Sequence, residues 1–167
     1  MTVTLIGMPG AGKSMMGIKL AKALGYTWID GDRAIEERTG RKLQNIINED
    51  GMDAFRKLEE EVLLSLASDR TVVSTGGSAI YYDKAMMNFK AHGVVVYLCV
   101  GRDEIIRRLG DYSKRGIVLA PGATIGDLYD ERVPLYEKYA DLTINCDGRE
   151  YATYQNNLNE SVKALLK

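Results

Sequence analysis

Residues 3–14, with the sequence VTLIGMPGAGKS, decide the fold of this chain. They begin with a continuous apolar and β-branched run, which is typical of a strand that is buried on both faces. The run leads into a loop of small residues that matches the pattern G-x-x-x-x-G-K-S from Gly7 to Ser14. The segment that follows, KSMMGIKLAKALG, has the apolar spacing of a helix that ends at Gly25. The sequence therefore predicts a strand, a glycine loop and a helix in immediate succession.

The glycine loop has two interpretations. As a phosphate loop, it would turn its backbone N–H groups toward phosphate oxygens, and the helix N-terminus would add the positive end of its dipole. Lys13 would then reach the β- and γ-phosphates of a nucleotide, and Ser14 would hold Mg²⁺. The alternative is a glycine turn followed by an incidental Gly-Lys-Ser. The position between a strand and a helix favours the phosphate loop, with these nucleotide-binding residues: Gly10, Ala11, Gly12, Lys13, Ser14 and Met15.

The rest of the chain alternates short apolar runs with segments of helical period. This alternation is typical of an α/β fold, in which a parallel sheet of about five strands is flanked by helices on both faces. The length of 167 residues fits one domain. We expect further strands at 26–32, 71–77, 94–100 and 141–146, and helices at 34–40, 42–51, 52–68, 82–93, 102–111, 126–140 and 150–167.

Composition excludes several classes of protein. A net charge of −1 argues against a nucleic-acid binder, which usually has a basic excess. The two cysteines, Cys99 and Cys146, have no CxxC spacing, which argues against a zinc site and fits free thiols in a reducing cytosol. No apolar run approaches the roughly 20 residues that span a bilayer, and the N-terminus lacks the pattern of a signal peptide. We therefore expect a cytoplasmic monomer with no membrane or nucleic-acid partner.

Two acids, Asp30 and Asp32, close the second predicted strand. Residues two apart in an extended segment share a face, so both carboxylates would lie near the phosphate loop. One could hold Mg²⁺, usually through water, and the other could orient or deprotonate an acceptor hydroxyl. The alternative is a pair of acids in a solvated turn that caps the next helix. Since no acid ends the third predicted strand, we expect the metal ligands to be Ser14 and Asp30.

Arginines further along the chain predict an anionic acceptor. Arg56 could grip a small carboxylate, and Glu59, three residues later on the same predicted helix, could hold that arginine in place. The alternative is an ordinary helical ion pair. Arg132 could add to the capture of the carboxylate, and Arg115 could close over the phosphates and stabilise the transferring group. For these two arginines the alternative is a surface position.

Two further loops bear on the site. Gly76 and Gly77 follow the third predicted strand, where they either let the backbone approach a ligand closely or form a plain tight turn. Residues 112–125, YSKRGIVLAPGATI, have no clean periodicity and contain Gly and Pro. We expect a mobile lid over about residues 111–124.

Together these segments resemble the shikimate kinase family, whose fold is similar to that of nucleoside-monophosphate kinases. The resemblance runs over nearly the whole chain and rests on the phosphate loop, the paired acids and the segments FRKLEEE, STGG, RRLG and RVPLYEKYAD. It implies ATP- and Mg²⁺-dependent phosphorylation of a hydroxyl of shikimate, which gives shikimate 3-phosphate and ADP in aromatic amino acid biosynthesis. It also implies one kinase domain over 1–167, with an acceptor-binding helical part at about 33–61.

The resemblance also implies roles for single residues. Lys13 and Ser14 serve the phosphates and Mg²⁺, and Asp30 serves the metal through water. Asp32 contacts the acceptor hydroxyls and is a candidate base. The other implied contacts are Arg56 and Arg132 with the acceptor carboxylate, Gly76 and Gly77 with the acceptor pocket, Arg115 with the phosphates and Arg108 with the adenine.

The chain departs from the family pattern at two places. Ser78 stands where a third consecutive glycine is usual, so a hydroxyl is added at the edge of the acceptor pocket. Gly116 stands where proline is usual in the closing loop, which loosens that loop. Both changes bear on the acceptor and not on the nucleotide loop, so a related kinase of another small hydroxy acid or amino acid, such as homoserine, is the alternative. A nucleotide-dependent switch is the second alternative, although the motifs that a switch needs are not visible.

Overall fold

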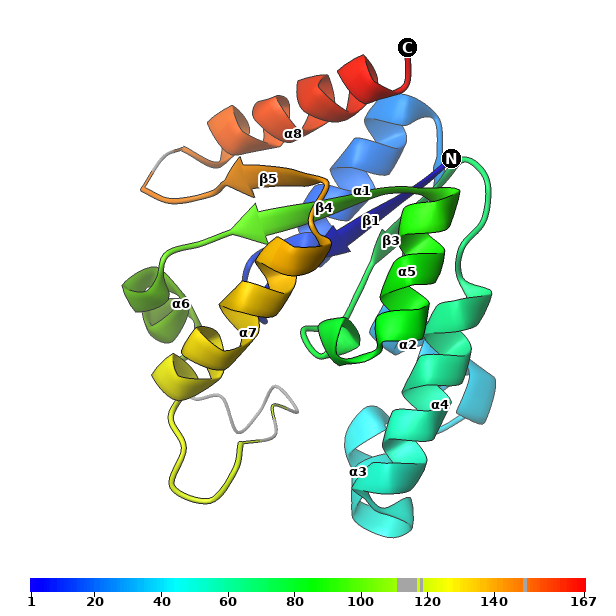
Figure 1. Cartoon of the computed structure of the whole chain (residues 1–167), viewed down its shortest axis with the longest axis vertical. Coiled ribbons are helices and arrows are strands. Elements are labelled where there is room, and N and C mark those ends of the chain that lie inside the picture. The colour runs from blue at the N-terminus through cyan, green and yellow to red at the C-terminus, as the bar shows by residue number, and fades with distance from the viewer. Residues whose placement is uncertain (111–116, 118, 149) are drawn as a thin grey trace.

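The computed structural model describes residues 1–110, 117, 119–148 and 150–167. In this part of the chain, five strands form one sheet in the order β2-β3-β1-β4-β5, and every pairing is parallel. This confirms the predicted parallel sheet (Figure 1). The strands are β1 (Thr2–Ile6), β2 (Thr27–Asp30), β3 (Thr71–Ser74), β4 (Gly93–Cys99) and β5 (Leu142–Asn145).

Helices cover both faces of the sheet, as the alternating pattern predicts. Figure 1 shows α1 and α8 on one side of the sheet and α5 and α7 on the other, and the contacts between these elements agree. Of the helices in the described residues, none is long and apolar enough to cross a membrane. The helices are α1 (Lys13–Leu24), α2 (Gly31–Thr39), α3 (Leu43–Asp50), α4 (Met52–Ser65), α5 (Asp83–His92), α6 (Arg102–Leu109), α7 (Ile125–Tyr139) and α8 (Tyr151–Leu165), with a short 3₁₀ turn η1 (Ala79–Tyr81).

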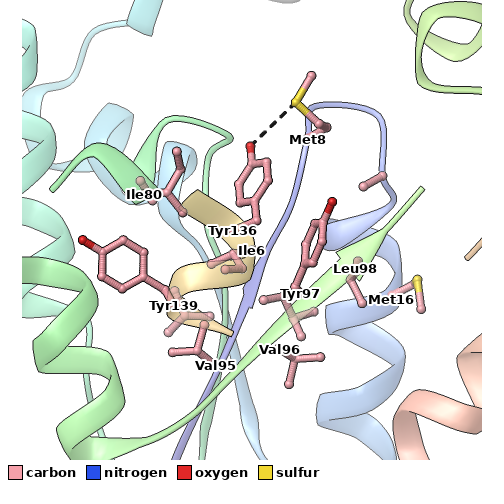
Figure 2. Packing of buried hydrophobic residues seen from close by; sticks show 14 of the residues in the cluster. Ile6, Met8, Met16, Ile80, Val95, Val96, Tyr97, Leu98, Tyr136 and Tyr139 are labelled. Atoms are coloured by element: carbon pink, nitrogen blue, oxygen red, sulfur yellow. Dashed lines mark hydrogen bonds between the residues drawn. The ribbon is translucent and has the colours of Figure 1, made fainter. Parts of the chain in front are cut away.

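The central strands β1 and β4 form the core of the sheet. Every residue of β1 is buried, Thr2 and Thr4 included, which fits its run of apolar and β-branched residues. Tyr97 of β4 stacks on Tyr136 of α7 with 5.2 Å between the ring centroids. The hydroxyl of Tyr136 donates to the carbonyl of Gly77 at 2.8 Å and points toward Met8 of the glycine loop (Figure 2). The core therefore fixes two loops at the carboxyl edge of the sheet.

One boundary differs from the expected one in a way that bears on the site. The second strand ends at Asp30 instead of continuing to residue 32, so Asp32 lies in the first turn of α2. The reason is local: Asp30 accepts a hydrogen bond from the N–H of Arg33 and caps the helix. Pro134 lies inside α7, which continues through it. Of the expected lid, residues 111–116 and 118 lie outside the described residues, so its mobility stays a prediction.

Helix α1 lies unusually close to β2 and β3 at Gly17. A Cβ atom at this position would lie 2.3 Å from Ser74 Oγ and 2.8 Å from Trp28 Nε1. The Trp28 indole donates to Ser74 Oγ at 3.0 Å, and Ser74 Oγ donates to the carbonyl of Lys13 at 2.7 Å. The absence of a side chain at Gly17 thus lets β3 hold the first turn of α1, which carries Lys13.

We predict that Gly17→Ala destabilises the protein. Alanine gains about 1 kcal/mol of helix propensity over glycine, but overpacking at this contact costs roughly 1–3 kcal/mol, so the net change is a loss. Trp28 is the single tryptophan, so its fluorescence reports urea unfolding at this contact. The control is Ile18→Ala, whose side chain is 47% exposed on the same helix, with a change within about 0.5 kcal/mol. A Gly17→Ala variant that is more stable than the wild type would contradict the close contact.

Candidate active site

A cleft of about 910 Å³ opens at the carboxyl end of the sheet. Its wall comes from the glycine loop, from α2, α3 and α4, from the turn after β3, from residues 117 and 119–121, and from α7. The parallel topology explains this meeting, because the carboxyl ends of parallel strands lie at one edge of the sheet. The following predicted site residues line the cleft: Lys13, Ser14, Asp30, Asp32, Arg56, Gly76, Gly77 and Arg132.

The glycine loop has the backbone of an anion site. Gly10 and Gly12 have φ values of 82° and 94°, a region that L side chains rarely adopt. Within the described structure, no side chain caps the N-terminus of α1 and no acid lies in its first turn. The first N–H groups of α1 therefore remain available, and the helix dipole favours negative charge there.

Lys13 is buried at the base of this loop. Its ammonium group donates to the carbonyls of Gly7 and Met8, the latter at 3.2 Å. Burial lowers the pKa of Lys13 to about 8, although the negative charge of Asp32 partly opposes this shift. A buried cation folded over its own loop is a ready ligand for a phosphate.

Ser14 and Asp30 lie together next to Lys13. The Ser14 hydroxyl donates to Asp30 Oδ2 at 2.9 Å, while Asp30 Oδ1 caps α2. Asp30 therefore caps the helix with one oxygen, as one interpretation predicts, while its other oxygen faces the glycine loop, and its role as a metal ligand stays a prediction. No group of three or more His, Cys, Asp or Glu residues in the described ranges could hold a metal by itself. A hydroxyl and a carboxylate are oxygen ligands that fit Mg²⁺, which usually completes its shell with phosphates and water.

Asp32 faces the turn after β3. A Cβ atom at Gly76 would lie 2.5 Å from Asp32 Oδ1, so only glycine permits this approach. Burial raises the pKa of Asp32, and the nearby charge of Lys13 opposes the shift. The two acids thus converge on the glycine loop as predicted, although they do so from a strand end and a helix start and not from one face of a strand.

Arg132 is a buried cation on α7, with 7% of the residue exposed. A Cβ atom at Gly77 would lie 2.7 Å from its Nη1, so Gly77 leaves the space that the guanidinium uses. No carboxylate among the described residues forms an ion pair with Arg132. Arg56, an exposed residue on α4, lines the same cleft. A buried cation without an anionic partner is costly, and a small anion bound in the cleft beside it would offset that cost.

Glu59 does not pair with Arg56 in this structure, contrary to both interpretations of these two residues, since each required an ion pair between them. No ion pair joins the two side chains, both of which lie in described parts of the chain. Glu59 is instead buried, and it accepts a hydrogen bond from the Ser78 hydroxyl at 2.7 Å. Burial raises the pKa of Glu59, and the hydrogen bond from Ser78 opposes this shift. The sequence pattern does not predict the pairing of Ser78 with Glu59. Its one visible signal is a serine at position 78, where the family usually has glycine.

Arg108 does not line the cleft. Its Nη1 donates to the carbonyl of Gly10 at 3.2 Å, and its Nε donates to Glu104 Oε1 at 2.9 Å. It thus supports the glycine loop from α6, and its contact with an adenine stays a prediction. Arg115 lies outside the described residues.

We predict a pH-dependent loss of stability in Ser78→Ala. Folding raises the pKa of Glu59. Between the pKa of the unfolded state and that of the folded state, the folded protein keeps a proton that the unfolded chain has released. The contribution of Glu59 to stability therefore falls as the pH rises from the lower pKa to the higher one. Without the Ser78 hydrogen bond the penalty grows, and we expect a loss of roughly 1–3 kcal/mol at about pH 8. Urea unfolding at about pH 5 should give a smaller loss.

The matched control for Ser78 is Ser65→Ala. The Ser65 hydroxyl donates to the backbone carbonyl of Val62, an uncharged acceptor, on the same helix as Glu59. Its effect should not depend on pH between the same two values. Equal losses at both pH values in Ser78→Ala would contradict the link to Glu59.

Comparison with known proteins agrees with this geometry. A family model described as "Shikimate kinase" matches residues 9–164. A shikimate kinase from Thermobifida fusca is 41% identical over 143 residues, which cover 84% of this chain and 83% of that protein. One from Mycobacterium avium is 38% identical over 148 residues, with 87% and 84% covered.

A solved structure, the shikimate kinase from Acinetobacter baumannii in complex with shikimate, has a TM-score of 0.84 and 31% identity. The match covers 99% of this chain and 92% of that one. The five-stranded parallel sheet, the glycine loop and the cleft all agree with this kinship. The chain belongs to the shikimate kinase family.

Proposed function

We propose that this cleft transfers the γ-phosphoryl group of ATP to a hydroxyl of shikimate. The family of the chain supports the reaction, and the shikimate bound to the similar structure from Acinetobacter baumannii supports the acceptor. The observation that carries the proposal is Arg132, a buried cation without a carboxylate partner in the described structure, which shares a cleft with Lys13 and Asp32. An anion site, a phosphate site and a carboxylate of raised pKa thus line one cavity.

The donor half rests on the glycine loop. Lys13 and the backbone N–H groups of the loop bind the β- and γ-phosphates and hold the γ-phosphorus toward the acceptor. Since these groups are already fixed by the buried contacts of α1, little reorganisation accompanies transfer. The further proposed nucleotide contacts are Gly10, Ala11, Gly12, Ser14, Met15, Arg108 and Arg115.

Ser14 and Asp30 are the proposed ligands of Mg²⁺. Their oxygens lie 2.9 Å apart at the mouth of the loop, and both are of the type that Mg²⁺ prefers. When bound, Mg²⁺ would neutralise negative charge on the phosphates. A cytoplasmic location and a monomeric state stay predictions from the sequence.

The acceptor half orients a hydroxyl beside Asp32. Arg56 and Arg132 bind the acceptor carboxylate, and Gly76 and Gly77 form the wall that lets ligand and charged groups approach. Asp32 takes the proton of the acceptor hydroxyl as the oxygen of that hydroxyl attacks the γ-phosphorus. The bond from the γ-phosphorus to the bridging oxygen breaks, and ADP leaves with that electron pair. The raised pKa of Asp32 makes this carboxylate a stronger proton acceptor than an ordinary aspartate.

An acceptor panel tests the function. ADP release from ATP and Mg²⁺ is measured with shikimate, with homoserine and without an acceptor. We expect strong stimulation by shikimate alone. If homoserine stimulates ADP release and shikimate does not, homoserine is the acceptor. Tight nucleotide binding without stimulation by any acceptor would favour a nucleotide-dependent switch.

The same assay tests Asp32. Asp32→Asn keeps the shape and removes the basic oxygen, so we expect kcat to fall by roughly 10²–10⁴-fold. The KM for ATP should stay near its wild-type value. An unchanged kcat would remove Asp32 from the proton transfer.

Proton uptake on nucleotide binding tests Lys13. Its pKa of about 8 means that half of the molecules have a neutral amine near that pH, and phosphate beside the amine favours the protonated form. We therefore expect ATP binding to take up a proton at about pH 8.5 and the Kd for ATP to rise as the pH rises through 8. Calorimetric titrations in two buffers of different ionisation enthalpy measure this uptake.

The control for this titration is Lys13→Met, which binds ATP more weakly and should take up no proton. Nucleotide phosphates are already fully ionised at this pH, so they do not contribute. The same uptake in the wild type and in Lys13→Met would contradict the assignment of the proton to Lys13.

A further inference from the structure

Tyr81, at the end of the turn η1, contacts the buried Arg132 in two ways. Its hydroxyl accepts a hydrogen bond from Arg132 Nε at 3.3 Å, and its ring lies 5.4 Å from the guanidinium carbon in a cation–π contact. The same hydroxyl donates to Glu131 Oε2 at 2.5 Å. Tyr81 is 44% exposed and lines the cleft. The roles given above to the glycine loop, Asp30 and Asp32 do not explain why Tyr81 bonds to both Glu131 and Arg132.

The direction of these hydrogen bonds is fixed by chemistry. A phenol has one proton, and Glu131 as a carboxylate can only accept it. The lone pairs of Tyr81 are therefore left for Arg132 Nε. Burial raises the pKa of Tyr81, and the bond to Glu131 adds to this shift, so the phenol keeps its proton at neutral pH.

This arrangement leaves the terminal nitrogens of Arg132 without a carboxylate partner among the described residues, although the Tyr136 hydroxyl also lies against the guanidinium. The guanidinium has five N–H donors, and its two terminal nitrogens form the fork that binds a carboxylate bidentately. Tyr81 occupies Nε, whereas Nη1 lies beside Gly77 at the cleft. Because the phenol is neutral, it orients Arg132 without neutralising its charge. A direct ion pair with Glu131 would compete with an anionic ligand for the same cation.

We infer that Tyr81 is a positioning residue that sets the affinity of Arg132 for the carboxylate of the acceptor, with Glu131 fixing the proton of the phenol. This inference rests on the proposed function, in which Arg132 binds that carboxylate. It assigns to Tyr81 an effect on acceptor binding and none on the transfer step.

Tyr81→Phe tests the inference, since it keeps the ring and removes the hydroxyl. We expect the KM for shikimate to rise about three- to twelvefold, which is the scale of one ordinary hydrogen bond, with kcat and the KM for ATP within about twofold of the wild type. With the amide of shikimate as acceptor, the two proteins should have the same KM. The matched control is Tyr129→Phe, whose hydroxyl donates to the carbonyl of Val100 from the same helix as Arg132.

Arg132→Lys separates this inference from the proposed function. If Arg132→Lys raises the KM for shikimate and Tyr81→Phe does not, Tyr81 has no positioning role and the inference fails alone. If neither variant raises it, Arg132 does not bind the carboxylate and the proposed acceptor site fails as well. A third outcome is that Tyr81→Phe raises the KM for the amide as much as the KM for shikimate, or lowers kcat by the same factor. Either result would show a structural effect and overturn the inference.

Discussion

The buried ammonium group of Lys13 is the constraint on which the site depends. Removing a charge from water costs several kcal/mol, and here two loop carbonyls and the charge of Asp32 offset only part of it, since the pKa falls to about 8. A phosphate bound beside the ammonium group, as proposed above, would relieve the remaining cost. The close contact of α1 at Gly17 and the hydrogen bond from Ser74 hold this strained position in place. Under the proposed function, the stability lost by burying this charge would be recovered as affinity for nucleotide.

The acceptor end of the cleft also holds buried ionisable side chains, and there their hydrogen-bond partners are neutral hydroxyl groups. Glu59 and Arg132 are a buried acid and a buried base, yet no ion pair between them occurs in the described residues. Each is instead contacted by a hydroxyl from the turn after β3, Ser78 for the acid and Tyr81 for the base. A hydroxyl satisfies a charged group without cancelling its charge. The cleft therefore keeps a free cation for an anionic acceptor while its side chains stay oriented.

The fold could be predicted from the sequence because its signals are local. The run of apolar and β-branched residues in β1 and the apolar run in β4 follow from burial on both faces, and the glycine loop follows from its spacing. Asp32 was misplaced because a cap at Asp30 starts α2 early, which strand periodicity cannot show. The pairs Ser78–Glu59 and Tyr81–Arg132 are 19 and 51 residues apart in the chain. No spacing rule links such positions, so only the packing of η1 against α4 and α7 reveals them.

The departure from the family pattern at Ser78 falls where the site can accept it. A side chain at Gly76 or Gly77 would displace a site residue, because a Cβ atom would meet the Asp32 carboxylate at one position and the Arg132 guanidinium at the other. Ser78 has an ordinary backbone conformation, with φ of −89°, and its hydroxyl bonds to Glu59. The chain thus retains the two glycines that leave room for Asp32 and Arg132, and the added Ser78 hydroxyl bonds to the buried Glu59. This substitution is compatible with the same anionic, hydroxylated acceptor, because it leaves both of those approaches open.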